Sequence, residues 1–476
     1  MKNLTVDLAQ RKNINNIWNF GINTCHAPLW LRNDLQLHLK CLKQNCGFNY
    51  VRFHSTLNDD MDTVLADGSF NFDKAAAVFK NIIALGMTPF VEISSMPSAL
   101  ASNDEYVCEY KFRSAPPADW NKWHELIRSF ISTLSDTFGK DELKKWYFEV
   151  WNEPDIPFWS GSKEEYFKLY DITRHAVKSV CREFRVGGPA TSKTAWIGDF
   201  CKHVSAPSEF DDDKGIRCDF VSSHAYPSDL AFLDGADGNV ELLEADLLFD
   251  LCSKARRTID EKLSRDIPFI FGEWNSSAGP YAFNHDDCNN APFICKTMAE
   301  LSDIVQGSMY WNATDIYEES KFHYTPFHGG YGLLNVNDIP KSSFHAFRML
   351  NELAGDRVSC SFDGEKSSEH GAIAAVERKQ LRIIVWNYRQ PDSQGVPLEF
   401  KFSGIPSGTA ITGEFILPEN GSAYECWRRL GSPDYLNRRF LDALENAAIP
   451  LKKTINSDQT VELAPGTAAL FTCQLP

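Results

Sequence analysis

Long hydrophobic runs are absent from this sequence. No window approaches the roughly 18 consecutive apolar residues that a membrane-spanning helix needs. The first residues, MKNLTVDLAQRKNINNIW, contain neither the apolar segment nor the small-residue cleavage site of a secretory signal. We therefore expect a protein without membrane association and, from this N-terminal segment, a cytoplasmic one.

The sequence also lacks a cysteine pattern and an excess of positive charge. Its 13 cysteines are odd in number and include no CxxC pair, which favours reduced thiols over a disulfide framework or a zinc site. The formal net charge of −16 disfavours nucleic acid and anionic lipid as partners. We expect a small neutral ligand, no metal and no other cofactor, and the sequence leaves a homo-oligomer open.

The length predicts more than one domain. A chain of 476 residues exceeds the size at which a single hydrophobic core stops growing. With 43% hydrophobic and 24% charged residues, the composition is that of an ordinary globular protein. We expect a large domain over residues 14–350 and a smaller one over 351–476.

Strand-like and helix-like segments alternate through the first 315 residues or so. Four amphipathic segments have the apolar spacing of helices, at 72–86, 119–139, 163–181 and 246–263, and another helix is expected at 342–354. Eight strands alternating with helices predict a parallel (β/α)₈ barrel, or TIM barrel, of the α/β class. The eight predicted strands are 18–23, 50–54, 88–94, 146–152, 184–188, 219–226, 267–275 and 307–312.

The rhythm changes after residue 354. Short strands separated by turns follow one another, with little helix except around 433–446. This pattern is typical of an antiparallel β-sandwich, and we expect residues 1–13 to contribute one of its strands, because the two ends of a domain often lie together. The predicted strands are 357–362, 373–378, 381–389, 398–405, 409–417, 460–464 and 468–475.

Polar and aromatic residues follow several of the predicted barrel strands. The functional residues of such barrels collect at the C-terminal ends of the strands. These ends read RFH (52–54), WNEPD (151–155), SHAYP (223–227), GEWNSS (272–277) and YWNATDIYEE (310–319). Carboxylates, imidazoles, amides and flat rings are the groups that a sugar pocket needs.

Two glutamates stand out, Glu153 after the fourth strand and Glu273 at the end of the seventh. A retaining glycosidase needs one carboxylic acid to protonate the leaving oxygen and one carboxylate to attack the anomeric carbon. Arg52 and His54 share one face of the second strand, and Arg52 is expected to keep Glu273 ionised. This predicts Glu273 as the nucleophile and Glu153 as the acid/base. Their structural alternatives are a helix cap for Glu153 and a salt bridge with Arg52 for Glu273.

Together with PFHGGYGLLN (326–335), these motifs resemble glycoside hydrolase family 39, the family of β-xylosidases and α-L-iduronidases. The resemblance implies a retaining mechanism, a barrel followed by a β-sandwich, and the same roles for Glu153 and Glu273. It also implies that Asn152 binds the sugar 2-hydroxyl and His54 another hydroxyl. It further implies that His224 and Tyr226 border the nucleophile, that Trp311 floors the pocket, and that either Glu318 or Glu319 binds a distal pair of hydroxyls.

The function that this resemblance implies is an exo-acting β-xylosidase, which releases xylose from the non-reducing end of xylo-oligosaccharides by double displacement. The same chemistry on a β-glucoside, an α-L-arabinopyranoside or a β-galactoside is the alternative within the enzyme class. An iduronidase is disfavoured, because Arg52 is the only cation that the sequence places in the pocket to bind a uronate. A catalytically silent carbohydrate-binding barrel, or an assembly subunit that uses the sandwich, represents a different class.

Overall fold

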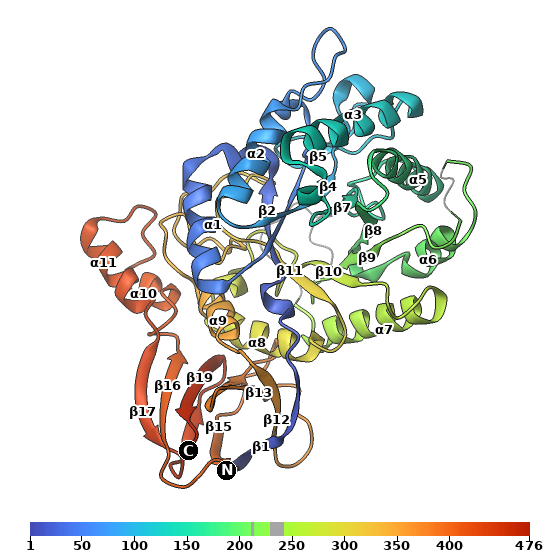
Figure 1. Ribbon diagram of the computed structural model, residues 1–476. Helices are drawn as coiled ribbons and strands as arrows, with labels where there is room; N and C mark the ends of the chain where they lie inside the picture. The colour runs from blue at the N-terminus through green and yellow to red at the C-terminus, as the bar shows by residue number, and fades with distance from the viewer. Residues whose placement is uncertain (211–213, 229–241) are drawn as a thin grey trace.

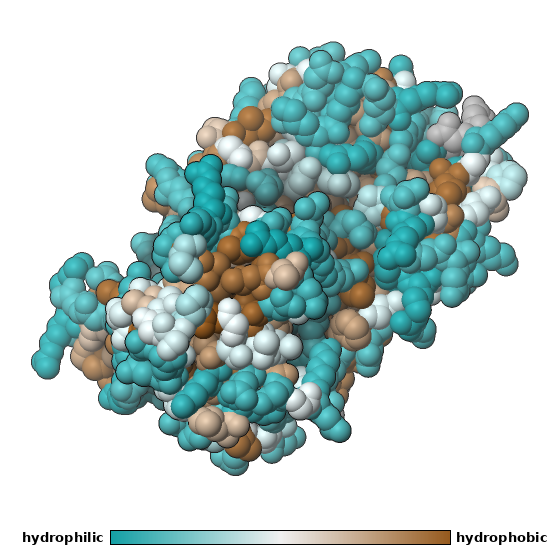
Figure 2. Space-filling view, turned by 60° about the horizontal axis from the view of Figure 1, so that its bottom comes forward, coloured by the Kyte–Doolittle hydropathy of each residue, from teal (hydrophilic) through white to brown (hydrophobic). Residues whose placement is uncertain are grey.

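The computed structural model describes residues 1–210, 214–228 and 242–476. Figure 1 shows a barrel surrounded by helices above a smaller sheet, with the N- and C-termini close together at the far end of that sheet. Hydrophilic side chains cover most of the face in Figure 2, and hydrophobic ones gather near its centre. Among the described residues, no helix is long and apolar enough to cross a membrane.

The larger part of the chain is a closed barrel of eight parallel strands. Each predicted barrel strand overlaps an observed one, so the (β/α)₈ prediction is confirmed. Because the strands are parallel, their C-terminal ends open at one mouth. In barrel order the strands are β10 (Phe269–Trp274), β11 (Gly307–Tyr310), β2 (Gly21–His26), β3 (Tyr50–His54), β4 (Thr88–Ile93), β7 (Tyr147–Val150), β8 (Arg185–Thr191) and β9 (Phe220–His224).

Helices surround the barrel (Figure 1). All five predicted helical segments are present, as α2 (Asp73–Ala84), α3 (Trp120–Phe138), α5 (Lys163–Val180), α7 (Asp246–Lys262) and α9 (Ser342–Asn351). The starts of α3 and α5 are fixed by capping side chains, Asp119 in α3 and a Ser162–Glu165 capping box in α5. Among the described helices around the barrel, those not predicted are α1 (Asn33–Cys46), the short α4 (Lys140–Leu143), α6 (Ile197–Ser205) and α8 (Asn290–Leu301).

The second part is a nine-stranded sheet that pairs the N-terminal strand with the C-terminal ones. Strand β1 (Lys2–Asn13) pairs antiparallel with β12 (Asp356–Phe362) and parallel with β15 (Leu398–Ser403), so the sheet is mixed and not purely antiparallel. The other strands are β13 (His370–Glu377), β14 (Gln380–Asn387), β16 (Ala410–Ile416), β17 (Leu451–Asn456), β18 (Val461–Leu463) and β19 (Thr467–Gln474). The short helices α10 (Tyr424–Arg429) and α11 (Arg438–Ala447) lie between β16 and β17.

Strand β17 is the one C-terminal strand that the pattern missed. It reads LKKTIN and lies at one edge of the sheet, with its lysines and threonine exposed. Lysine on an edge strand discourages pairing with another chain, but it removes the alternation of apolar and polar residues by which strands are identified.

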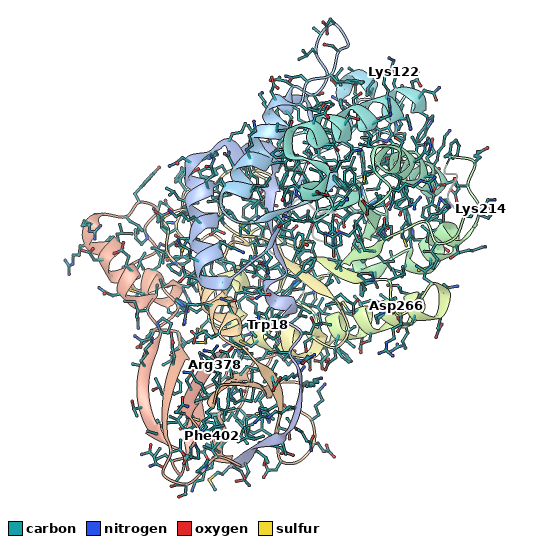
Figure 3. All side chains as sticks on the ribbon, in the orientation of Figure 1. Trp18, Lys122, Lys214, Asp266, Arg378 and Phe402 are labelled. Atoms are coloured by element: carbon teal, nitrogen blue, oxygen red, sulfur yellow. The ribbon has the colours of Figure 1, made fainter. Side chains whose placement is uncertain are left out.

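The sheet curls so that its two ends pack face to face, as in a sandwich. Phe400 and Phe402 of β15 contact Phe471 of β19, with ring centroids 6.0 and 5.2 Å apart, although several strands separate β15 from β19 in the sheet. These rings belong to a core separate from that of the barrel; Figure 3 labels Phe402 in the sheet core and Trp18 in the barrel core. Helix α8 packs against β13, β14 and β19 and so joins the two parts. The domain limits at 13/14 and 350/351 stay a prediction.

Replacement of Phe471 by alanine should destabilise the protein by about 3–5 kcal/mol, because it leaves a cavity between the two faces of the sheet. Phe471→Leu fills most of that space and should cost clearly less. Urea unfolding followed by fluorescence and circular dichroism measures both. Equal stabilities of Phe471→Ala and the unchanged protein would contradict a packed interior at this residue.

Candidate active site

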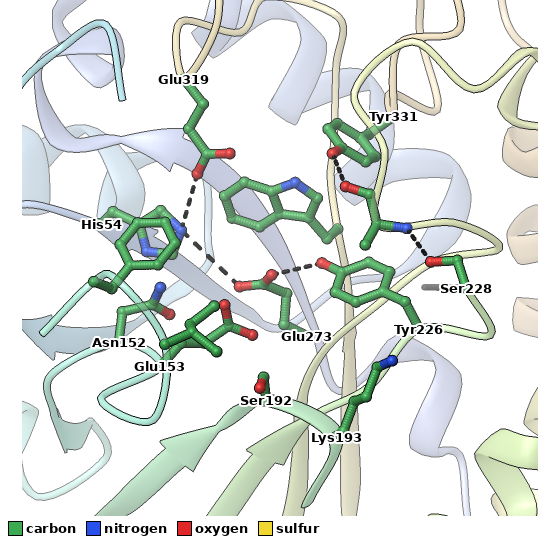
Figure 4. Close-up of a pocket in the computed structure, with 14 residues that line it drawn as sticks. His54, Asn152, Glu153, Ser192, Lys193, Tyr226, Ser228, Glu273, Glu319 and Tyr331 are labelled. Carbon is green, nitrogen blue, oxygen red and sulfur yellow. Dashed lines mark hydrogen bonds and ion pairs between the residues drawn. The ribbon is translucent and has the colours of Figure 1, made fainter. Parts of the chain in front are cut away.

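One pocket opens at the C-terminal ends of the barrel strands (Figure 4). Polar groups from six strand ends or the loops that follow them converge there, together with several aromatic rings. The lining residues are His54, Asn152, Glu153, Ile156, Phe158, Ser192, Lys193, Tyr226, Ser228, Glu273, Ala278, Trp311, Glu319 and Tyr331.

Glu153 lies three residues beyond the end of β7, in a turn with an unusual backbone. Its φ is +40°, and that of Trp151 is +72°, in the left-handed region that non-glycine residues rarely adopt. The turn is held because the Glu153 amide donates to Ala190 O (2.9 Å) and the Trp151 indole donates to Phe158 O (2.8 Å). The fold thus maintains a conformation that costs of the order of 1–3 kcal/mol, and it buries the Glu153 carboxyl in the pocket.

Glu273 lies on β10, opposite Glu153, and three polar side chains lie near its carboxylate. Arg52 Nη1 lies 3.1 Å from Glu273 Oε2, the Tyr226 hydroxyl donates to Oε1 at 2.5 Å, and His54 Nε2 lies 4.0 Å from Oε2. A cation and a hydroxyl donor both favour the ionised carboxylate. The preceding residue is Gly272, where a Cβ would stand only 3.3 Å from His224 Nε2.

His224, at the end of β9, lies between the two acids. Its Nδ1 is 3.1 Å from Glu153 Oε1 and 3.7 Å from Glu273 Oε2. One carboxylate oxygen of each glutamate and one nitrogen of this imidazole all lie within 4.8 Å of one another. An inverting enzyme needs room for a water molecule between one carboxylate and the anomeric carbon of the sugar. Two carboxyl groups at this separation leave no such room.

The two glutamates differ in their electrostatic surroundings. Burial and the nearby Glu273 raise the pKa of Glu153 well above its usual range. Burial also raises the pKa of Glu273, but Arg52, His54 and the Tyr226 hydroxyl lower it, so that its net rise is smaller. The surroundings therefore favour the proton on Glu153 and the negative charge on Glu273.

A fully buried cluster of charges holds this arrangement from below. Arg52, on β3, contacts Glu92 at 2.8 Å and Glu149 at 2.7 Å in addition to Glu273, and it donates to Asn152 Oδ1 at 2.9 Å. Glu92 lies on β4 and Glu149 on β7, to one side of β3, and Glu273 lies on β10, to the other, so Arg52 connects strands on both sides of its own. The guanidinium thereby fixes both the nucleophile candidate and the amide next to Glu153.

His54 and Glu319 form the deep end of the pocket. His54 Nδ1 lies 2.6 Å from Glu92 Oε2, and its Nε2 lies 3.4 Å from Glu319 Oε1. Burial lowers the pKa of His54, but Glu92 and Glu319 more than offset this and raise it to about 10, so the imidazole is protonated at neutral pH. The Tyr317 hydroxyl donates to the other oxygen of Glu319, and the Trp311 ring lies 4.8 Å from the His54 ring.

The candidate residues are brought together with one exception. Glu318 is partly exposed, faces Arg32 and His26 at 3.7 Å, and does not line the pocket. Glu319 does line it, and the binding of sugar hydroxyls by either glutamate stays a prediction. His224 contacts both glutamates directly, Tyr226 contacts Glu273, and Trp311 lies at the closed end.

Several pocket residues were not predicted, among them Ser192 and Lys193. The fifth barrel strand was expected to end at residue 188, but β8 continues to Thr191 and the pair follows directly. With the correct strand end, the rule that found the other residues would have included these two. Glu92 and Glu149 were missed because each lies inside an apolar strand, and only the barrel interior brings them to Arg52.

Glu153, His224 and Glu273 also meet the distance requirement of a metal site. The guanidinium of Arg52 lies 3.1 Å from one of these carboxylates, and a fixed positive charge beside the site opposes a cation there. The donor set therefore suits a proton and a sugar better than a metal ion.

The chain resembles known proteins over its whole length. The model of "Glycosyl hydrolases family 39" matches residues 3–461. A β-xylosidase of Caldicellulosiruptor saccharolyticus is 36% identical, over 94% of this chain and 92% of its own length, and one of Geobacillus stearothermophilus is 33% identical over 94% and 89%. The crystal structure of a monomeric β-xylosidase from Caulobacter crescentus CB15 superposes with a TM-score of 0.88 at 26% identity, over all of both chains.

A match across nearly the entire chain, together with two relatives above 30% identity, leaves no doubt about its classification. The chain belongs to glycosyl hydrolase family 39, and it is therefore a glycosidase built on a (β/α)₈ barrel with a β-sandwich.

Proposed function

We propose that this protein is a retaining, exo-acting β-xylosidase that releases xylose from the non-reducing end of xylo-oligosaccharides. The observation that carries the proposal is the pair Glu153 and Glu273, which point at each other across one pocket with carboxylate oxygens within 4.8 Å. Retaining glycosidases separate their two carboxyl groups by about 5–5.5 Å, and inverting enzymes by about 6.5–9.5 Å. The two relatives above 30% identity are both named β-xylosidases.

The roles of the two acids follow from their surroundings. Glu273, ionised by Arg52 and Tyr226, attacks the anomeric carbon, while Glu153 transfers its proton to the departing glycosidic oxygen. Glu153, now ionised, then removes a proton from water, whose oxygen displaces Glu273 from the sugar. The anomeric configuration is inverted twice and is therefore retained.

The closed end of the pocket suits a neutral sugar. Asn152, His54 and Glu319 offer donors and acceptors for hydroxyl groups, and the ring of Trp311 offers an apolar face. The positive charges there are already paired, Arg52 with Glu92 and Glu149, and His54 with Glu92 and Glu319. The carboxylate of a uronate bound at this end would lie near the negative charge of Glu319, and no unpaired cation there would bind it. This disfavours an iduronidase. β-Glucosides, α-L-arabinopyranosides and β-galactosides are the competing neutral substrates.

Buried side chains close the pocket at one end, which supports exo action. Glu319, Trp311 and Tyr331 are all less than 10% exposed, and the Tyr331 hydroxyl is fixed by its bond to Ala278 O at 2.6 Å. A chain of sugars can then enter from one side only, so cleavage releases a terminal unit.

Cellular location and assembly are also part of the proposal. The 13 cysteines are all free thiols and eight of them are buried, which fits a reducing compartment such as the cytoplasm. The Caulobacter crescentus relative is described as monomeric. A homo-oligomer of this chain stays a prediction that its mass in solution would decide.

Replacement of Glu273 by alanine should remove hydrolysis of nitrophenyl β-xyloside, because no group can then form the glycosyl-enzyme. Added azide should partly restore turnover and give the α-xylosyl azide, since a small anion fits the space left by the carboxylate. Release of nitrophenol measures the rate, and NMR of the product gives its configuration. Undiminished hydrolysis by this variant would refute the role of Glu273.

The variant Glu153→Ala should lose about 10²–10⁴-fold in kcat on xylobiose but far less on dinitrophenyl β-xyloside, whose leaving group needs no proton. In the unchanged enzyme, kcat/KM should fall at high pH as Glu153 ionises and at low pH as Glu273 is protonated. Because the pKa of Glu153 is the higher one, the alkaline limb belongs to it and should vanish in the variant. Equal losses on both substrates would argue against the acid role.

Glu319→Gln should lower kcat/KM on nitrophenyl β-xyloside roughly 10–100-fold, because it replaces a charged acceptor of sugar hydroxyls by a neutral amide. Glu318→Gln, one residue away but facing Arg32 outside the pocket, is the matched control and should stay within about twofold. Similar losses in both variants would mean that the loop, and not the Glu319 carboxylate, determines the rate.

A further inference from the structure

Lys193 is a pocket cation that the catalytic scheme does not use. It follows the end of β8, in the short 3₁₀ helix η5 (Ser192–Thr194), and it is half-buried in the wall of the pocket. Within residues 1–210, 214–228 and 242–476, no carboxylate lies within 4 Å of its ammonium group, and no ring lies beneath it.

The other charged groups of the pocket are all paired. Glu273 contacts Arg52 and Glu319 contacts His54, while Glu153, the acid that holds the proton, contacts His224, whose pKa burial lowers well below its usual value. Lys193 alone among the described lining residues brings a charge with no counter-charge. An unpaired ammonium in a pocket wall suits an anion that arrives with the substrate.

The segment that carries Lys193 is held in place. The Ser192 amide and hydroxyl donate to the two oxygens of Asp155 at 2.9 and 2.6 Å, which ties this segment to the turn of Glu153. The backbone of Lys193 is left-handed, with φ +46° and ψ +34°, as is that of Thr194 with φ +54°. Such a conformation is unfavourable for lysine and persists only where surrounding contacts fix it, so the ammonium is presented by a fixed backbone and not by a free loop.

The position of Lys193 assigns it to the leaving group. In Figure 4, Lys193 and Glu319 lie at opposite ends of the pocket, with Glu153 and Glu273 between them. Glu319 is buried at the closed end, whereas Lys193 is half-buried. Because the sugar that is released occupies the closed end, the departing part of the substrate lies beyond the acid pair, on the side of Lys193.

We propose that Lys193 binds a carboxylate on the leaving group, so that the enzyme favours xylosides whose aglycone is acidic, such as a xylo-oligosaccharide that carries a uronate. This inference rests on the proposed β-xylosidase function. An acidic aglycone would otherwise be repelled by Glu273 and Asp155, and Lys193 offsets that repulsion at the open end. A neutral aglycone gains nothing from the charge.

Two aryl β-xylosides of nearly the same shape test the proposal, one with a 4-carboxyphenyl and one with a 4-(methoxycarbonyl)phenyl leaving group. The quantity to compare is the ratio of kcat/KM for the acid to kcat/KM for the ester. In Lys193→Met this ratio should fall on the order of five- to tenfold, the size expected of a partly solvated charge-assisted bond. Lys193→Arg should keep the ratio, and Lys193→Glu should lower it further.

The comparison of ratios removes differences in leaving-group reactivity, which are the same for every variant. Methionine leaves the left-handed backbone as unfavourable as lysine does, so the substitution changes charge with little change in backbone cost. Lys202→Met, on the exposed side of α6, is the matched control and should leave both rates unchanged. In the unchanged enzyme the preference should weaken between 0.05 and 0.5 M NaCl because salt screens the charge.

The outcomes separate this inference from the proposed function. Hydrolysis of the ester with an unchanged ratio in Lys193→Met would overturn the role of Lys193 and leave the xylosidase intact. An equal fall on both substrates would do the same, because it indicates contact with a neutral group or a local folding defect. Hydrolysis of neither xyloside by the unchanged enzyme would refute the β-xylosidase proposal, and the inference with it.

Discussion

The buried guanidinium of Arg52 is the interaction on which the rest of the site depends. It lies inside the barrel, without exposure to solvent, and three carboxylates surround it, from Glu92, Glu149 and Glu273. Removing any of these charges from water costs several kcal/mol, and only the close mutual contacts offset that cost. The same contacts fix Glu273 at one wall of the pocket and Asn152 beside Glu153 at the other.

The charges of the pocket are arranged in two halves that serve different purposes. At the closed end, Arg52 and His54 are balanced by glutamates, so the surroundings of the first sugar carry little unpaired charge. At the open end, Lys193 stands without a partner among the described residues. This asymmetry matches the reaction. The closed end holds the neutral glycosyl unit that is transferred, whereas the open end faces the leaving group, whose structure can vary.

Two turns that carry pocket residues have an unusual backbone. Trp151 and Glu153 after β7, and Lys193, Thr194 and Trp196 after β8, all have positive φ. Asp155 joins these turns through its bonds to Ser192. The rigid barrel strands next to each turn can maintain such conformations, because the hydrogen bonds between the strands do not depend on the conformation of the turn.

The sequence by itself determined the class of fold and the family. Strand and helix periodicity located the eight barrel strands, since side chains that face the core recur with a fixed spacing whatever the tertiary details. Strand ends then pointed to Glu153 and Glu273, whose catalytic roles stay a proposal, and the motif order identified the family. Only the tertiary structure decided that Glu319 and not Glu318 enters the pocket, that Glu92 and Glu149 surround Arg52, and that Lys193 belongs to the wall. These facts depend on the direction in which a loop turns and on contacts between residues far apart in the chain. A local pattern of residue types predicts neither the direction of a loop nor such contacts.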